Sequence, residues 1–137
     1  MDDHLMLGDF ALLEPIAQGG MGQVWCARHR TGLEAAVKVM VPEGSARPAW
    51  IEALNAEIRA VAGLDHPHIV WIHDAGSVTE QESARSQRQF PAGGPWLAME
   101  LARKGTLKDL KVDDWDTASQ LLSDLLGALA HAHAKGI

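Results

Sequence analysis

The sequence has little of what would direct a protein to a membrane, to the cell exterior or to nucleic acid. Its 137 residues contain one cysteine, Cys26, which can form no internal disulfide and so fits a reducing compartment. No run of eighteen apolar residues is present, so no membrane-spanning helix is expected. The acidic start MDDHLMLGDF lacks the basic residues of a secretory signal. The formal net charge of −6 argues against a nucleic-acid surface. We therefore expect a cytoplasmic protein with neither a membrane nor a nucleic-acid partner.

What the sequence does contain is the composition of one folded domain. Apolar residues make up 47 % of the chain and charged residues 22 %, which is typical of a globular protein. A length of 137 residues favours a single domain. Near the start, three β-favouring runs are separated by turns that contain glycine: residues 10–16, 24–26 and 35–41. This succession predicts an antiparallel meander.

One helix and two further strands are predicted next. Residues 48–62 repeat apolar side chains at helical spacing and are followed by Gly63, which predicts a helix. Short apolar runs at 69–72 and 96–101 predict two strands. Residues 79–94 show no periodicity and end in Gly-Gly-Pro, so we expect an extended, mobile surface loop there.

The last stretch predicts a second long helix. Asp113 or Asp114 can cap its start. Apolar residues then recur at helical spacing: Ala118, Leu121, Leu122, Leu125, Leu126 and Leu129. A small sheet cannot cover all of these leucines, so we expect the helix to self-associate or to bind another chain. The predicted fold class is α+β, a five-stranded antiparallel sheet with one helix packed on it, followed by the first helices of an incomplete helical part.

The segment IAQGGMGQVW holds the densest group of glycines. It is not a Walker A loop, because no Lys-Ser or Lys-Thr follows the last glycine, and a β-favouring run stands where a dinucleotide fingerprint needs a helix. A glycine hairpin between two strands can still fold over phosphates, since its bare N–H groups approach the oxygens closely. Taken alone, the segment is a weak signal for phosphate binding, and a plain structural hairpin is the favoured interpretation.

Lys38 is a cation inside the apolar run AAVKVM. An ammonium group there is costly unless it has an anionic partner or lies at a polar site. The alternative is an edge-strand lysine whose stem reaches water. Glu57 shares the inward face of the predicted helix with Leu54 and Val61. We therefore expect Lys38 and Glu57 to form an ion pair, with their charged atoms within about 4 Å, that holds the ammonium group towards phosphate oxygens.

The histidines do not predict a metal site. His66, His68 and His73 lie close together in sequence, but no Cys or carboxylate stands at a supporting spacing. His131 and His133 are two residues apart on a helix and point in different directions. We expect His131 and His133 to pack and to form hydrogen bonds near the end of the helix.

In this order and at this spacing, the motifs resemble those of protein kinases. GGMGQV resembles the glycine-rich loop, with Ala17 in the place of its first glycine. Lys38 matches the strand lysine, Glu57 the helix glutamate, and MELA at 99–102 the hinge. The chain is most similar to bacterial-type (Hanks-type) serine/threonine kinases in the segments GGMGQV, HPHIV and ALAHAHAKGI. The resemblance implies a partial kinase domain over 1–137, with the ATP-binding lobe and hinge at about 7–102 and the start of the helical lobe at 103–137.

The resemblance implies an enzyme that transfers the γ-phosphate of ATP to Ser or Thr hydroxyls of a protein substrate, with Mg²⁺. Lys38 would contact the α- and β-phosphates, and Met99 would be the gatekeeper beside the adenine. The residues expected around ATP are Ile16, Ala17, Gln18, Gly19, Gly20, Gly22, Val24, Ala36, Lys38, Met99, Glu100 and Ala102.

The sequence does not contain the catalytic Asp loop or the Mg²⁺ ligands that follow in the family. Kinase catalysis depends on positioning and on metal-assisted stabilisation of charge, so we expect the 137-residue chain alone to be inactive. Two alternatives are a pseudokinase and a truncated module that binds nucleotide or a partner. The presence of both Lys38 and Glu57 favours an active parent kinase.

Overall fold

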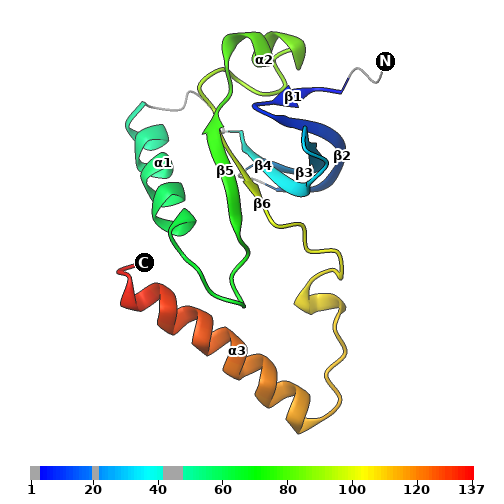
Figure 1. The fold of residues 1–137 in the computed structure, drawn as a ribbon, viewed down its shortest axis with the longest axis vertical. Coiled ribbons are helices and arrows are strands. Elements are labelled where there is room, and N and C mark those ends of the chain that lie inside the picture. Colours follow the sequence, from blue (N-terminus) through cyan, green and yellow to red (C-terminus); the bar gives the residue numbers. More distant parts are fainter. Residues whose placement is uncertain (1–3, 20–21, 42–47) are drawn as a thin grey trace.

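The computed structural model describes residues 4–19, 22–41 and 48–137. The described residues form one six-stranded antiparallel sheet, three α-helices and a short 3-10 helix (Figure 1). In their spatial order, the strands are β1 (Met6–Leu7), β2 (Phe10–Gly19), β3 (Gly22–His29), β4 (Glu34–Met40), β6 (Pro95–Met99) and β5 (Ile72–Ser77). The helices are α1 (Pro48–Ala62), α2 (Glu80–Arg85), the 3-10 helix (Leu107–Asp109) and α3 (Trp115–Ala134).

The predicted α+β class, the meander and both long helices are confirmed. Strands β2, β3 and β4 pair in sequence order, and Gly32 turns the chain between β3 and β4 with a φ of 92°, which glycine adopts without strain. Helix α1 has the predicted limits. Of the two candidate caps for α3, Asp114 is the one used, and its Oδ1 accepts the Thr117 N–H at 2.7 Å.

The prediction of five strands was wrong, because the sheet has six. Strand β1 is only two residues long, too short to show a period-2 pattern, and it is held by pairing with the start of β2. The strand predicted at 69–72 instead runs from Ile72 to Ser77. Its sequence IHDAGS favours no strand by propensity, but pairing with β6 along the sheet edge outweighs that preference.

The prediction of a mobile loop at 79–94 was also wrong. Thr79 and Glu82 form a capping box that starts helix α2. Two backbone hydrogen bonds close the base of the segment, from the Val78 N–H to the Gly94 carbonyl (2.8 Å) and from the Gly93 N–H to the Val78 carbonyl (2.7 Å). Phe90 is fully buried in the hydrophobic core. Local backbone bonds and one buried aromatic ring thus fix a segment that shows no periodicity.

The pleat of β4 gives the sheet two different faces. Val37 and Val39 point into the main core, which also contains Phe10, Phe90 and Trp96. Helix α1 contacts β5 and β6 and stands beside β5 in Figure 1. Ile58, on this helix, is buried. The alternate residues of β4, Ala36 and Lys38, therefore point to the opposite face.

Helix α3 lies apart from the sheet, at the end of the molecule away from α2 (Figure 1). It meets residues 64–69 through His68, whose Nε2 is 3.3 Å from Asp124 Oδ1. His131 on α3 also packs against His66, with 5.3 Å between ring centroids. The packing predicted for His131 thus agrees with the structure. None of the helices within the described ranges combines the length and apolar character needed to cross a bilayer.

Candidate functional site

Lys38 lies at the border of two cavities. One, of about 220 Å³, lies beneath the β2–β3 hairpin, and its walls are Ala17, Gln18, Gly19, Gly22, Val24 and Lys38. The other, of about 280 Å³, lies between the sheet and α1, and its walls are Lys38, Leu54, Glu57, Ile58, Val61, Val70, Ile72, Leu97 and Met99. Lys38 therefore contributes a positive charge to the wall of a glycine-lined cavity and to the wall of an apolar one.

Register in the sheet explains why these side chains share one face. Val24 pairs with Lys38, Lys38 with Leu97, and Ala36 with Met99. Directly opposed residues in a sheet point to the same side. Val24, Ala36, Lys38 and Met99 thus form one row across three strands, on the face opposite Val37 and Val39.

At one end of the glycine hairpin, the backbone conformation and the close packing require glycine. Gly22 has a φ of 144°, and a Cβ at this position would collide with the backbone carbonyl of Val39. A Cβ at Gly19, its cross-strand partner, would meet no other atom within 4 Å. The steric need for glycine is therefore at Gly22. The predicted site residue Gly20 lies outside the described residues.

The predicted ion pair between Lys38 and Glu57 is absent. Both residues line the cavity beside α1, but none of the ion pairs within 4.0 Å among the described residues joins them. Glu57 is exposed, so water solvates its carboxylate where the helix now stands. A solvated pair of this kind gains little free energy from closing, so its attraction does not fix the distance of α1 from β4.

The predicted hinge begins at Met99, the last residue of β6, and continues directly after the strand. The Glu100 N–H donates to the Trp71 carbonyl (2.8 Å), and the Trp71 N–H donates to Glu100 Oε2 (3.3 Å). These two bonds hold the start of the 100–103 segment against the residue before β5. Ala102 is exposed, as is Ile16 on β2, and neither lines the two cavities described above.

The α1 side of the site contains residues that the sequence analysis did not assign to it. Leu54, Ile58 and Val61 form the apolar stripe of α1, and they line one cavity together with Ile72 and Leu97 from the sheet. The helical spacing of that stripe was the available signal, since an inward-facing stripe must be covered by something. Its partners depend on tertiary placement and carry no local signal.

Acidic groups suited to a metal ion are not gathered in the described part of the chain. Across residues 4–19, 22–41 and 48–137, no three His, Cys, Asp or Glu side chains are grouped so that they could hold one. The carboxyls with a clearly lowered pKa, Asp109 and Asp114, lie outside both cavities. In each, a backbone N–H is the main cause, from Thr106 for Asp109 and from Thr117 for Asp114.

Comparison with known proteins finds relatives over almost the whole chain. The chain is 36 % identical over 135 residues to the serine/threonine-protein kinase PknA of Mycobacterium tuberculosis, which covers 95 % of this chain and 30 % of the relative. It is 32 % identical over 133 residues to PknH of Mycobacterium bovis, and 31 % identical over 143 residues to a probable serine/threonine-protein kinase PknB of Bifidobacterium longum. The chain thus spans less than a third of the length of these curated relatives.

Among solved structures, the chain is similar to the kinase domain of M. tuberculosis PknI. The TM-score is 0.76 at 22 % identity, and the alignment covers all of this chain and 52 % of the solved one. At this identity the similarity concerns the fold. No family model matches the sequence.

Proposed function

Because this chain belongs to the bacterial-type serine/threonine protein kinases, we propose that it is the ATP-binding part of an enzyme that phosphorylates Ser or Thr in proteins. The observation that carries the proposal is the position of Lys38, between the space under the glycine hairpin and the cavity shared with Glu57. A cation at a glycine-lined opening suits the phosphates of a nucleotide. In this proposal, residues 7–102 form the nucleotide-binding lobe and hinge, and 103–137 begin the helical lobe.

The residues present fit a nucleotide. Gly22 lets the hairpin lie close to the Val39 carbonyl, which any Cβ would strike, and backbone N–H groups of the hairpin can face phosphate oxygens. Lys38 would neutralise the α- and β-phosphates, while Val24, Ala36 and Met99 offer one apolar row for the adenine. Ile16, Ala17, Gln18, Gly19 and Gly20 would complete the hairpin side, and the backbones of Glu100 and Ala102 would recognise the adenine edge.

Mg²⁺ and the proton acceptor need groups that this sequence does not supply. The described residues offer no acidic cluster at the site. We propose that the catalytic Asp and the metal ligands belong to kinase segments outside this sequence, so the 137 residues alone bind nucleotide without transferring phosphate. We also propose a cytoplasmic location, and self-association through the exposed leucines of α3.

Titration calorimetry with ATP tests the binding proposal. We expect weak binding by the wild-type chain and binding at least about tenfold weaker by Lys38→Ala, the loss of one charge-assisted contact. Lys111→Ala removes an exposed lysine far along the chain and should bind as the wild type does. Equal affinity of wild type and Lys38→Ala would refute the role given to Lys38.

An ADP-release assay tests the second half of the proposal. We expect no turnover above background from the 137-residue chain. Robust turnover that depends on Lys38 would show that the chain needs no further catalytic segment. A pseudokinase, the alternative, would bind nucleotide and would still fail to turn over when the remaining kinase segments are supplied.

A further inference from the structure

The segment from Val78 to Gly94, which contains α2, packs on the core side of the sheet, opposite the face of the candidate site. In Figure 1, α2 stands over β1 and β2, on the side of the sheet away from α3. The pleat of β3 separates the two sides: Val24 lines the cavity beneath the hairpin, while its neighbours Gln23 and Trp25 point the other way. The segment therefore contacts β3 from behind the nucleotide space.

Gln89 makes a direct polar contact with the base of the hairpin. Its side-chain Nε2 donates to Gln23 Oε1 at 3.0 Å, across 66 positions of sequence. The same oxygen accepts the Trp25 Nε1–H at 3.1 Å. Gln23 is the residue next to Gly22 and pairs with Gln18 on β2. The side-chain oxygen of Gln23 thus accepts two hydrogen bonds beside the hairpin.

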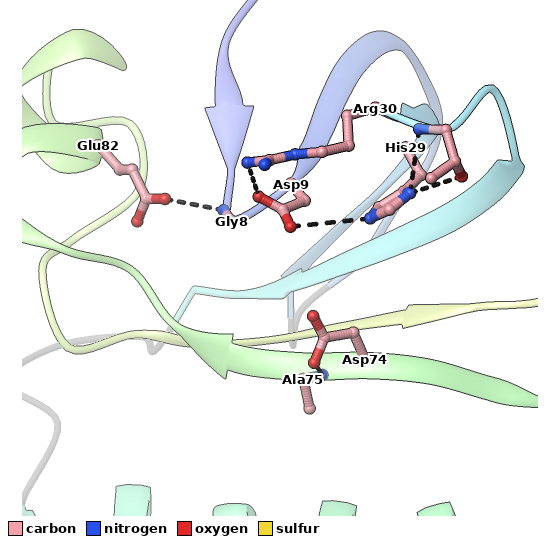
Figure 2. Close-up of polar contacts among 8 residues, drawn as sticks. Gly8, Asp9, His29, Arg30, Asp74, Ala75 and Glu82 are labelled. Atoms are coloured by element: carbon pink, nitrogen blue, oxygen red, sulfur yellow. Dashed lines mark hydrogen bonds and ion pairs between the residues drawn. The ribbon is translucent and has the colours of Figure 1, made fainter.

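Two further contacts tie the same segment to β3 and to the turn between β1 and β2. Phe90 is fully buried and meets the Trp25 ring edge-on, with 6.2 Å between centroids and an interplanar angle of 88°. Glu82 Oε1 accepts the Gly8 N–H at 2.9 Å, just before β2 starts (Figure 2). The segment is therefore attached to β3 next to the hairpin, and to the chain just before β2 at Gly8.

The two residues before Gln89 have a strained backbone. Gln87 and Arg88 have φ angles of 52° and 62°, a left-handed conformation that costs a non-glycine residue about 1–2 kcal/mol. Hydrogen bonds hold the chain there, from the Arg88 N–H to the Ser83 carbonyl (2.8 Å) and from the Phe90 N–H to Ser86 Oγ (3.2 Å). Such strain persists only where the surrounding structure enforces it.

We propose that residues 78–94 form a brace that holds the glycine hairpin from the face opposite the nucleotide space, and that Gln89 is a positioning residue for nucleotide binding. The brace fixes β3 at Gln23 and Trp25, so the amides of Gly19 and Gly22 are held in place before a ligand arrives. The consequence for nucleotide rests on the proposed function, whereas the effect on the hairpin does not.

Segment-resolved hydrogen exchange on the 137-residue chain without nucleotide tests the brace itself. In Gln89→Ala, the amides of residues 18–19 and 22–24 should exchange about three- to tenfold faster, the range expected for loss of one net hydrogen bond. Gln81→Ala, an exposed change on α2, should leave them unchanged. Unchanged hairpin exchange in Gln89→Ala, or equal acceleration in Gln81→Ala, would overturn the proposal.

The chemistry of the contact gives a second, sharper comparison. Gln89→Glu keeps the shape and removes the donor, so it should accelerate exchange as Gln89→Ala does. If the Gln23 amide rotated, its NH₂ group could donate to the carboxylate of Gln89→Glu. That NH₂ group would then face Trp25 Nε1–H, from which it cannot accept a hydrogen bond, so the bond to Trp25 would be lost. Gln89→Lys restores a donor and should recover most of the protection. The same result from the Glu and Lys variants would contradict a role for the donated hydrogen bond.

Calorimetry separates this inference from the function on which it partly rests. We expect Gln89→Ala to bind ATP about three- to tenfold more weakly than wild type, following the loosened hairpin. Absence of ATP binding by the wild type would refute the proposed function and leave the exchange result as the test of the brace. Wild-type affinity in Gln89→Ala, together with faster exchange, would refute the positioning role.

Discussion

Lys38 on β4 and Glu57 on α1 form two walls of one cavity of about 280 Å³, yet their charges are not paired. The space between them is lined by apolar side chains such as Leu54, Val61 and Met99. Contacts of these apolar residues are non-directional, so they hold α1 against the sheet without fixing how far it stands from Lys38.

Glu57→Gln should therefore leave stability nearly unchanged. Since no ion pair is lost, we expect the free energy of unfolding to change by less than about 0.5 kcal/mol, as for an ordinary surface substitution. Urea denaturation of Glu57→Gln beside Glu52→Gln, an exposed change on the same helix, makes the comparison. A loss in Glu57→Gln of more than about 1 kcal/mol beyond the control would show that the pair forms in solution.

Gly22→Ala and Gly19→Ala should differ sharply. A Cβ at Gly22 would collide with the Val39 carbonyl, and the φ of 144° at this position is unfavourable for alanine. We therefore expect Gly22→Ala to lower the free energy of unfolding by more than about 2 kcal/mol. A Cβ at Gly19 meets nothing within 4 Å, and the change should be within about 1 kcal/mol. Denaturant titration of both proteins decides the matter, and equal losses would contradict the geometry at Gly22.

Phe90→Ala should destabilise the fold as a core truncation does. Phe90 is fully buried against the core, so we expect a loss of about 3–5 kcal/mol in the free energy of unfolding. Gln81→Ala, in the same segment but exposed, should change it by less than about 0.5 kcal/mol. If residues 79–94 were a mobile surface loop, the two variants would be equally stable.

The sequence predicted best what local pattern controls. The limits of α1 follow from its apolar spacing, and the meander follows from three β-favouring runs with glycine turns. Strand alternation also separates Lys38 from Val37, and so separates the site face from the core face. These features need only neighbours in sequence.

What was mispredicted depends on distant partners. The capping box of Thr79 and Glu82 is a local pattern that the sequence contains. The burial of Phe90, in contrast, depends on contact with Trp25, which is far away in the chain. Strand β5 forms from polar residues because β6 offers an edge. The separation of Lys38 and Glu57 depends on the position of α1 relative to the sheet. The spacing of apolar residues along this helix predicts which face points inward, but it does not specify that position.

The cap of α3 should titrate. The Thr117 N–H, and then the Thr117 hydroxyl, lower the pKa of Asp114 below its ordinary value of 3.8. A carboxyl whose pKa is lowered by folding stabilises the folded state above the unfolded pKa, and this contribution is lost as pH falls through the folded pKa. We expect the Thr117 amide signal in NMR to shift with a midpoint below 3.8. Asp114→Asn caps without titrating and should abolish that shift, and a midpoint above 3.8 would contradict the hydrogen bonds.

The exposed leucines of α3 should cause the chain to self-associate. Leu122, Leu125, Leu126 and Leu129 are each 46–63 % exposed, on a helix that meets the rest of the described chain through the loop at 64–69. Burying one leucine contributes about 1.5–3 kcal/mol, so covering several together is a strong drive towards contact with a second copy. Light scattering should give a mass above that of one chain, which falls to one chain in Leu122→Glu/Leu126→Glu. Leu107→Glu, an equally exposed leucine outside α3, should keep the wild-type mass. A wild-type mass of one chain, or the same decrease in Leu107→Glu, would refute association through this face.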